Sequence, residues 1–231
     1  MTFDDADTRK PNEYSSMLFL EPHAHLHFEQ TIKKSRFIAD AYAIPKLDDA
    51  KQALDIVRAS TSDARHHCHG YVLYTNGQLT SHSSDDGEPT GTAGQPILNV
   101  ITHMSLANVL VVVTRYFGGT LLGTAGLRRA YATSARRCLA GAQVFTHVDQ
   151  PIYAASVTLA MAGKVEAALR QANISLDAHY SDYSAAFIMP ATDEATLRRL
   201  VLAIDSSAQF ARLGSTSVSI PAGTLPTDET R

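Results

Sequence analysis

Residues 83–97 read SSDDGEPTGTAGQPI, a stretch that joins an expected strand to an expected helix. Three acids, Asp85, Asp86 and Glu88, lie close together, a glycine-rich turn follows them, and Pro96 stands where a helix can begin. Carboxylates favour a metal ion or a general base, whereas a glycine turn before a helix favours a phosphate. The two interpretations conflict because bare carboxylates repel phosphate. The stretch therefore predicts either a ligand site or a turn whose acids have partners within the protein.

The tetrapeptide GTAG ends this stretch at residues 91–94 and occurs again at residues 123–126. The second copy follows an expected buried strand over residues 108–116 and precedes an expected helix over residues 127–140. Backbone N–H groups in such turns can approach a ligand, so two turns on one domain could share a pocket. The alternative is that both are tight turns at helix entries. Neither copy is a P-loop, because no Gly-Lys-Ser/Thr sequence follows it.

Arg115 ends the apolar strand beside the second glycine loop. A bidentate pair between Arg115 and one of the acids would hold the two loops together. We favour this pair over a Mg²⁺ site formed by Asp85, Asp86 and Glu88, since ion pairs commonly satisfy such acids. A solvated acidic turn, or a carboxylate that caps the N–H groups that follow it, is a further alternative.

The run His66-His67-Cys68-His69 contains the residue types of a metal site, but it lies at an expected strand. Alternation along a strand puts His67 and His69 on one face and His66 and Cys68 on the other. Zinc usually takes three or four protein ligands, so neither face supplies enough. A nucleophilic His–Cys pair is the other interpretation, although a cysteine within a strand is more often a small buried hydrophobe. We therefore expect no metal and assign no catalytic residue.

Both halves of the chain are expected to be α+β. Residues 151–222 show the order strand, helix, strand, strand, helix, strand, which is the ferredoxin-like plan. Residues 21–140 form the expected first domain, and residues 141–150 are expected to be a linker. Residues 1–20 and 223–231 are expected to be flexible tails.

Composition restricts the partners. The chain has 231 residues, a net charge of −3 and two cysteines, which gives no overall charge for binding polyanions and no disulfide framework. No apolar run is long enough for a membrane span, and the N-terminus lacks the features of a signal peptide. A cytoplasmic protein without membrane contact is expected, with an oligomeric state that the sequence leaves open.

Basic residues gather at two places in the first domain. The candidates for nucleic-acid contacts are Lys33, Lys34, Arg36, Arg128, Arg129 and Arg136. Three of them lie around an expected β-turn, and three lie on the expected helix over residues 127–140. Phosphate backbones bind such faces in a salt-dependent way. A solvated helix face produces the same pattern, and this alternative stays open.

Four motifs in order resemble the YigZ/IMPACT family: KKSRF at 33–37, DARHHC at 63–68, SDDGEPTGTAGQPIL at 84–98 and VVVTRYFGGTLLGTAGL at 111–127. The resemblance implies that the first domain has the fold of domain 2 of a small-subunit ribosomal protein. It also implies a ferredoxin-like second domain similar to the last domain of elongation factor G. The family motif, which is also the candidate binding site, comprises Ser84, Asp85, Asp86, Gly87, Glu88, Gly91, Thr92, Gly94, Arg115, Tyr116, Gly118 and Gly119.

The resemblance further implies a translation-linked regulator that binds RNA or the ribosome, with no agreed catalytic residues and no cofactor. The alternative is a metal-assisted enzyme that acts on a phosphate-bearing small molecule, with Asp85, Asp86 and Glu88 bridging Mg²⁺ to phosphate. A third hypothesis is purely structural, with the two loops locking the fold.

Overall fold

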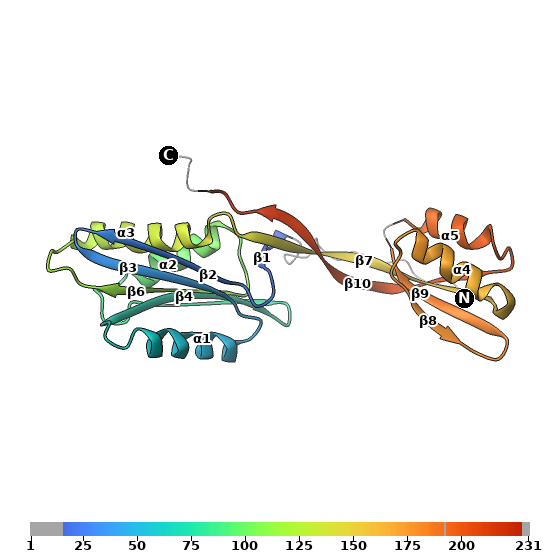
Figure 1. Ribbon diagram of the computed structural model, residues 1–231, viewed down its shortest axis with the longest axis horizontal. Coiled ribbons are helices and arrows are strands. Elements are labelled where there is room, and N and C mark those ends of the chain that lie inside the picture. The colour runs from blue at the N-terminus through green and yellow to red at the C-terminus, as the bar shows by residue number, and fades with distance from the viewer. Residues whose placement is uncertain (1–15, 192, 228–231) are drawn as a thin grey trace. The chain divides into compact units, whose positions relative to one another are not determined.

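The computed structural model describes residues 16–191 and 193–227, which form two compact units. Residues 16–147 and 220–227 make up the first unit, and residues 148–219 make up the second. Figure 1 shows both units as layers of helices on a β-sheet. None of the helices in the described ranges is both long enough and apolar enough to cross a membrane.

The first unit is built on a five-stranded antiparallel sheet in the order β2-β3-β6-β4-β5. The strands are β2 (His25–Ile32), β3 (Ser35–Ala43), β4 (His66–Thr75), β5 (Gln78–Ser84) and β6 (Val109–Tyr116). The sequence VLVVVTRY of β6 contains an uninterrupted valine- and leucine-rich run, and every residue of the strand before Tyr116 is buried. Such a run is typical of a central strand that is covered on both faces.

Three helices cover this sheet: α1 (Leu47–Ser60) lies on one face, and α2 (Gly94–His103) and α3 (Gly123–Leu139) lie on the other (Figure 1). Alternation along β6 divides the core accordingly. Leu110 and Val112 pack with the buried residues of α1, whereas Val111 and Val113 pack with those of α2 and α3. The sheet thus carries the start of β4 and the ends of β5 and β6 against the starts of α2 and α3, and the family motif lies at the ends of β5 and β6.

The second unit has the element order that the sequence predicts, β-α-β-β-α-β. Its sheet places β9 between β7 and β8, and β10 pairs with β7. The elements are β7 (Gln143–Thr158), α4 (Leu159–Gln171), β8 (Asp177–Tyr180), β9 (Ser184–Pro190), α5 (Glu194–Leu202) and β10 (Gln209–Thr224). A core cluster that includes Val165, Phe187 and Val201 lies between its helices and its strands.

The predicted linker and tails differ from the structure. Residues 143–150 continue as the first half of β7, because β1 (Phe19–Leu20) and β10 supply hydrogen-bond partners for its backbone. Phe19 and Leu20, which were assigned to a tail, are buried in the first unit. At the other end Leu225 is buried, and its N–H donates to the carbonyl of Ala142. Residues 1–15 and 228–231 of the predicted tails lie outside the described residues.

The two GTAG segments also differ from each other. Helix α2 begins at Gly94, so it takes only the last residue of the first copy. Helix α3 begins at Gly123, so the whole second copy forms its first turn, four residues before the predicted start. The expectation that both copies precede a helix therefore needs correction for the second one.

Candidate functional site

Asp85 occupies the N-terminus of α2. Its carboxylate accepts N–H bonds from Gly91 at 2.7 Å and from Ala93 and Gly94 at 2.9 Å. Burial alone would raise the pKa of this carboxyl, but the backbone N–H groups of residues 91–94 together hold the pKa below its usual value. The first GTAG turn therefore binds an anion, and that anion is the protein's own carboxylate.

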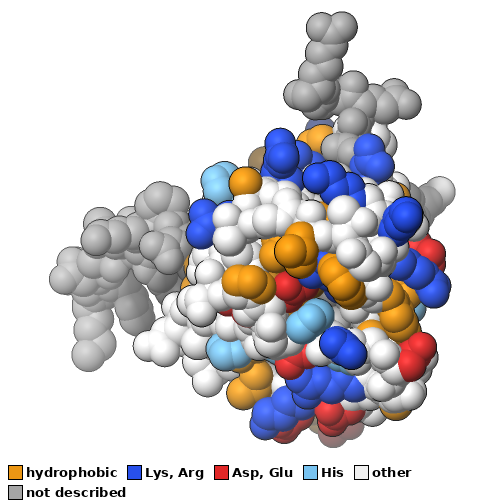
Figure 2. All heavy atoms as spheres, turned by 90° about the vertical axis from the view of Figure 1, so that its left-hand side faces the viewer, with side chains coloured by type: hydrophobic (Ala, Val, Ile, Leu, Met, Phe, Trp, Pro, Cys, Tyr) orange, Lys and Arg blue, Asp and Glu red, His pale blue; other side chains and the backbone are white. Residues whose placement is uncertain are grey.

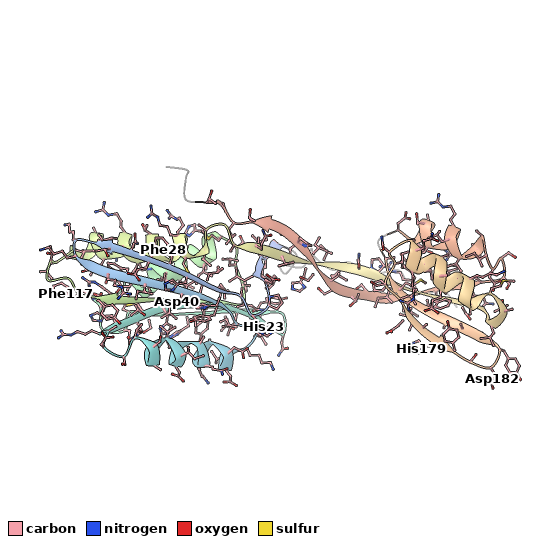
Figure 3. The ribbon with its side chains drawn as sticks, viewed as in Figure 1. His23, Phe28, Asp40, Phe117, His179 and Asp182 are labelled. Atoms are coloured by element: carbon pink, nitrogen blue, oxygen red, sulfur yellow. The ribbon has the colours of Figure 1, made fainter. Side chains whose placement is uncertain are left out.

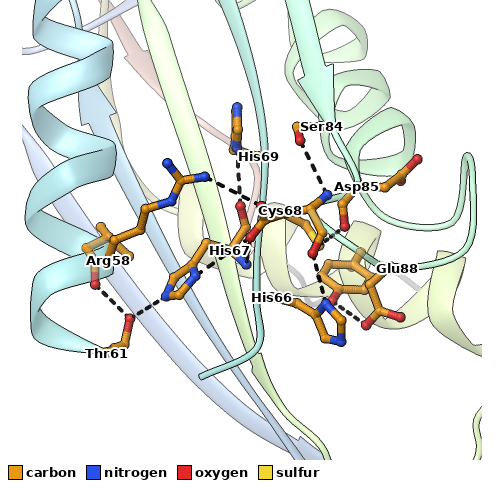
Figure 4. A network of polar contacts seen from close by, with 12 residues as sticks. Arg58, Thr61, His66, His67, Cys68, His69, Ser84, Asp85 and Glu88 are labelled. Atoms are coloured by element: carbon orange, nitrogen blue, oxygen red, sulfur yellow. Dashed lines mark hydrogen bonds and ion pairs between the residues drawn. The ribbon is translucent and has the colours of Figure 1, made fainter. Parts of the chain in front are cut away.

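Asp86 ties the same turn to β4. It has a positive φ of 40°, and its Oδ2 accepts the backbone N–H of His67 at 2.7 Å. Its Oδ1 lies 3.5 Å from a guanidinium nitrogen of Arg58 on α1. Its N–H donates to the hydroxyl of Ser84, and its carbonyl accepts from Nδ1 of His66 at 2.9 Å. Figure 4 shows this network across β4 and the turn.

Glu88 is the partner of Arg115. Oε1 of Glu88 lies 2.6 Å from Nη1 of Arg115 and accepts a second bond from the hydroxyl of Tyr131 at 2.8 Å. Both charged side chains are buried, with 6% of Arg115 and 4% of Glu88 exposed. Arg115 also donates to the hydroxyl of Ser35, and its buried Nε–H has no hydrogen-bond partner within residues 16–191 and 193–227. The expected ion pair between the two loops therefore exists, with Glu88 as its acid. The expectation of a bidentate pair is wrong, because Nη1 of Arg115 alone bonds to Glu88 while Nη2 bonds to Ser35.

The three acids do not converge on one point. Asp85 contacts backbone N–H groups, Asp86 contacts β4 and α1, and Glu88 contacts Arg115. Within the described ranges no group of three or more His, Cys, Asp or Glu side chains is placed to hold a metal ion. The geometry therefore favours the structural interpretation of the acidic turn over a shared Mg²⁺ site.

Cys68 is a buried core residue, as expected. Its thiol donates to the carbonyl of Asp85 at 2.9 Å, and burial raises its pKa to about 12, so it is protonated at neutral pH. His67 faces α1, where its Nε2 lies 2.9 Å from the hydroxyl of Thr61, whereas Cys68 packs in the cluster under α2 and α3. The predicted alternation along this strand is correct.

The glycine loop after β6 rests on the turn between β2 and β3. A Cβ atom on Gly118 would lie 2.0 Å from the carbonyl carbon of Lys34, and the Gly118 N–H donates to Ser35. Gly119 has a φ of 81°, which favours glycine. Tyr116, the last residue of β6, donates its hydroxyl to Asp63 at 2.7 Å. Three further motif positions belong to the first loop. Gly87 and Gly91 have positive φ, and Thr92 is buried, with its hydroxyl donating to the carbonyl of Pro89.

A cavity of about 300 Å³ opens beside this loop, and we call it the Phe117 cavity. Its lining residues are Arg65, His66, Glu88, Pro89, Arg115, Phe117, Leu121, Leu122, Gly123, Thr124 and Leu127. Phe117 and Leu121 are 52% and 83% exposed. Sequence reasoning assigned no role to either residue, although two apolar side chains in a glycine loop are the signal that could have identified them.

The six basic candidates are all exposed, but their contacts differ. Lys33 and Arg129 line one cavity of about 240 Å³, so the turn between β2 and β3 lies against α3. Arg36 forms a bidentate pair with Glu29, at 2.7 and 2.9 Å. Arg128 donates to the carbonyl of Gly91 at 3.1 Å, which ties α3 to the first glycine turn. Arg136 lies in the last turn of α3, away from the glycine loops.

Figure 2 views the end of the first unit where Figure 3 labels Phe117. Lys and Arg side chains surround hydrophobic side chains on this face, and a few acidic and histidine side chains lie among them. We call this surface, which carries Phe117, the basic end of the first unit. It includes Leu121, which lines the Phe117 cavity with Leu122, and Lys33 and Arg129, which line the neighbouring cavity with Leu122. It also includes Lys34, whose backbone lies against Gly118.

One buried acid was overlooked in the sequence. Asp40 on β3 accepts from His25 at 3.0 Å and from His27 at 2.8 Å, both on the neighbouring strand β2. Sequence reasoning assigned no role to these two histidines. An acid within an apolar strand opposite alternating histidines was the available signal.

Comparison with known proteins places these residues in a family context. The Impact N-terminal domain matches residues 33–139. IMPACT family member YvyE of Bacillus subtilis is 36% identical over 155 residues, which are 67% of this chain and 71% of that protein. IMPACT family member YigZ of Escherichia coli is 40% identical over 122 residues, which are 52% of this chain. The match spans only 60% of the length of YigZ.

A solved structure described as a hypothetical protein is also similar. Its TM-score is 0.54 at 29% sequence identity, and the alignment covers 84% of this chain and 96% of that one. The likeness therefore extends through both units.

Proposed function

The chain belongs to the IMPACT family, and from this we propose that it is a non-enzymatic, translation-linked regulator that binds RNA or the ribosome through its first unit. Such a role implies a cytoplasmic location. The proposal includes the likeness of the second unit to the last domain of elongation factor G, which its β-α-β-β-α-β order supports. It also includes the likeness of the first unit to domain 2 of a small-subunit ribosomal protein.

The observation that carries the proposal is the meeting of basic residues from distant segments. Lys33 in the turn between β2 and β3 and Arg129 on α3 line one cavity, and Lys34 and Arg128 are their exposed chain neighbours. Positive charge on one face binds a phosphate backbone by releasing its counterions, even when the net charge of the chain is negative. The net charge of −3 on the whole chain therefore does not prevent this face from binding a phosphate backbone.

The acidic turn supports a non-enzymatic role. Asp85, Asp86 and Glu88 each have their own partners in the fold. The thiol of Cys68, with its pKa of about 12, is not an activated nucleophile. In the part of the chain that the structure describes, the three acids do not gather as a metal-assisted enzyme would need.

The test is ribosome co-sedimentation of the full chain. The double variant Lys33→Glu/Arg129→Glu reverses two charges of the basic end without touching Arg128, whose guanidinium bonds to Gly91. We expect this variant to lose most of the co-sedimentation that the wild-type chain shows at low salt, because each reversed charge also repels phosphate.

The matched control is Lys164→Glu/Arg212→Glu, which makes the same charge change at exposed positions of the second unit. It should co-sediment as the wild type does. Equal co-sedimentation of both double variants, or none for the wild-type chain, would contradict the proposal.

A further inference from the structure

We propose that the Phe117 cavity takes one unpaired nucleotide of an RNA strand, with its base on the Phe117 ring and its phosphate at the N-terminus of α3. This inference rests on the proposed function and names the form of RNA that the basic end recognises. Four features of the described residues support it.

The first feature is an aromatic ring that is exposed yet supported. The guanidinium carbon of Arg115 lies 5.5 Å from the ring centroid of Phe117 and 5.5 Å from that of Phe37. Phe37 is completely buried. The buried cation therefore links an inner ring to an outer ring, and the outer ring is the layer on which a base can stack.

The second feature is a helix N-terminus without an anion. Leu122 at the N-cap of α3 makes no side-chain cap bond, and the first turn of α3 contains no acidic residue. Gly123 and Thr124, the first residues of the helix, line the cavity. At the N-terminus of α2 the carboxylate of Asp85 accepts backbone N–H bonds, which shows that a helix N-terminus of this unit can hold an oxyanion.

The third feature is a buried donor on a residue that lines the cavity. Arg115 lines the cavity with 94% of its side chain buried, and its buried Nε–H has no hydrogen-bond partner among the described residues. A buried donor of this kind is costly unless a ligand or a water molecule satisfies it. Glu88 also lines the cavity, but its carboxylate accepts hydrogen bonds from Arg115 and Tyr131. The positive charge of Arg115 offsets the negative charge of Glu88, so the carboxylate repels a phosphate only weakly.

The fourth feature is size and access. A cavity of about 300 Å³ is at the small end of ligand pockets, which suits one base with its phosphate. A base paired in a duplex must first be unpaired and unstacked, which costs a few kcal/mol, whereas single-stranded RNA offers unstacked bases. The rim residue Arg65 is exposed and can continue the contact along the strand. The site therefore selects single strands over duplexes.

The base contact is tested by fluorescence anisotropy with a labelled ten-nucleotide single-stranded RNA and a duplex of the same length. Phe117→Leu keeps apolar bulk but removes the aromatic face. We expect it to weaken single-strand binding by about 5- to 100-fold and to leave duplex binding unchanged. The control Tyr183→Ala removes an aromatic ring that is 88% exposed in the second unit, and it should change neither affinity.

The phosphate contact has its own matched pair of variants. Thr124→Asp puts a carboxylate at the start of α3, where it favours the helix while it competes with phosphate. Thr124→Asn has the same size without the charge. We expect at least a ten-fold loss of single-strand affinity for Asp relative to Asn, with equal thermal stability or higher stability for Asp.

The outcomes separate this inference from the proposed function. If the wild-type chain binds RNA but Phe117→Leu and Tyr183→Ala bind single-stranded RNA with equal affinity, the proposed nucleotide site is contradicted and the RNA-binding role is not. Equal affinity of the wild type for single strand and duplex would likewise contradict the nucleotide site and leave the RNA-binding role intact. If adenosine monophosphate binds in a Phe117-dependent way and neither RNA nor ribosomes bind, the cavity serves a free nucleotide, which overturns both the strand assignment and the proposed function.

Discussion

Glu88 and Arg115 form the ion pair on which the two motif loops depend. Both side chains are almost fully removed from solvent, so each charge needs the other. Tyr131 and Ser35 supply further hydrogen bonds to the pair. Burial of the pair costs desolvation, but removal of one partner costs more, because a lone buried charge remains.

Glu88→Gln should therefore lower the free energy of unfolding by about 3 kcal/mol, since it leaves the Arg115 charge buried and unpaired. Because the chain has no tryptophan, urea unfolding followed by circular dichroism is the suitable measurement. The control is Glu194→Gln, which breaks the exposed pair with Arg198 on α5 and should cost less than about 0.5 kcal/mol. Similar losses in the two variants would refute the structural importance of the buried pair.

Asp85 gives the protein a specific pH dependence. Its folded-state pKa lies below the unfolded value of about 3.9, so the ionised form stabilises the fold. This contribution is complete above the unfolded pKa and is lost as the pH falls through the folded pKa. We expect Asp85→Asn to be destabilised by about 2 kcal/mol at pH 7 and to lose stability less steeply than the wild type below about pH 4.

The matched control for that measurement is Asp48→Asn, whose side chain is 89% exposed. It should follow the wild-type pH profile. An Asp85→Asn profile parallel to the wild type would mean that the N–H groups of residues 91–94 do not hold the carboxylate.

Part of this residue-level detail was predictable. Position at a strand end beside a glycine loop identified Arg115 as the partner of an acid, and capping was an open alternative for the turn. The assignment of each acid was not predictable from spacing, because Asp86 has a positive φ and the direction of each carboxylate depends on the turn. Tyr131 could not be found either, since its contact with Glu88 spans 43 positions.

At the scale of elements, the two GTAG segments have different roles. The first is a turn closed by Asp85, and the second is the opening turn of α3. Sequence periodicity predicted the helices, but the predicted start of α3 was late because glycine and threonine are poor helix formers. The close packing of the loop after β6 on the turn between β2 and β3 holds α3 in place beside the basic residues.

Gly118→Ala tests this packing. An added Cβ would lie 2.0 Å from Lys34 backbone atoms, so the loop must move away from the turn. We expect a loss of about 2 kcal/mol in unfolding free energy and weaker RNA binding, because Lys33 and Arg129 would separate. Thermal melts and anisotropy check the two effects.

The control for this substitution is Gly163→Ala in α4, where an added Cβ has no neighbour within 4 Å. Alanine should stabilise that helix by about 0.5–1 kcal/mol. If Gly118→Ala is as well tolerated as Gly163→Ala, the loop does not need the close approach.

At the scale of the whole molecule, the chain combines a basic end in its first unit with an acidic total charge. The second unit follows its predicted element order, since its short strands and helices have clear local patterns. The ends of the chain were harder to predict, because Leu20 and Leu225 become buried only through pairing with distant segments. Local composition contains no information about such pairing.

The most direct test of the account is the salt dependence of RNA binding by the full chain. Anisotropy with a single-stranded RNA should show an affinity that falls linearly with salt on logarithmic axes. For Lys33→Glu/Arg129→Glu the slope should be smaller by about 1.4, as expected for two lost phosphate contacts, while Lys164→Glu/Arg212→Glu should keep the wild-type slope. An affinity independent of salt, or equal slopes for all three proteins, would contradict RNA binding at the basic end.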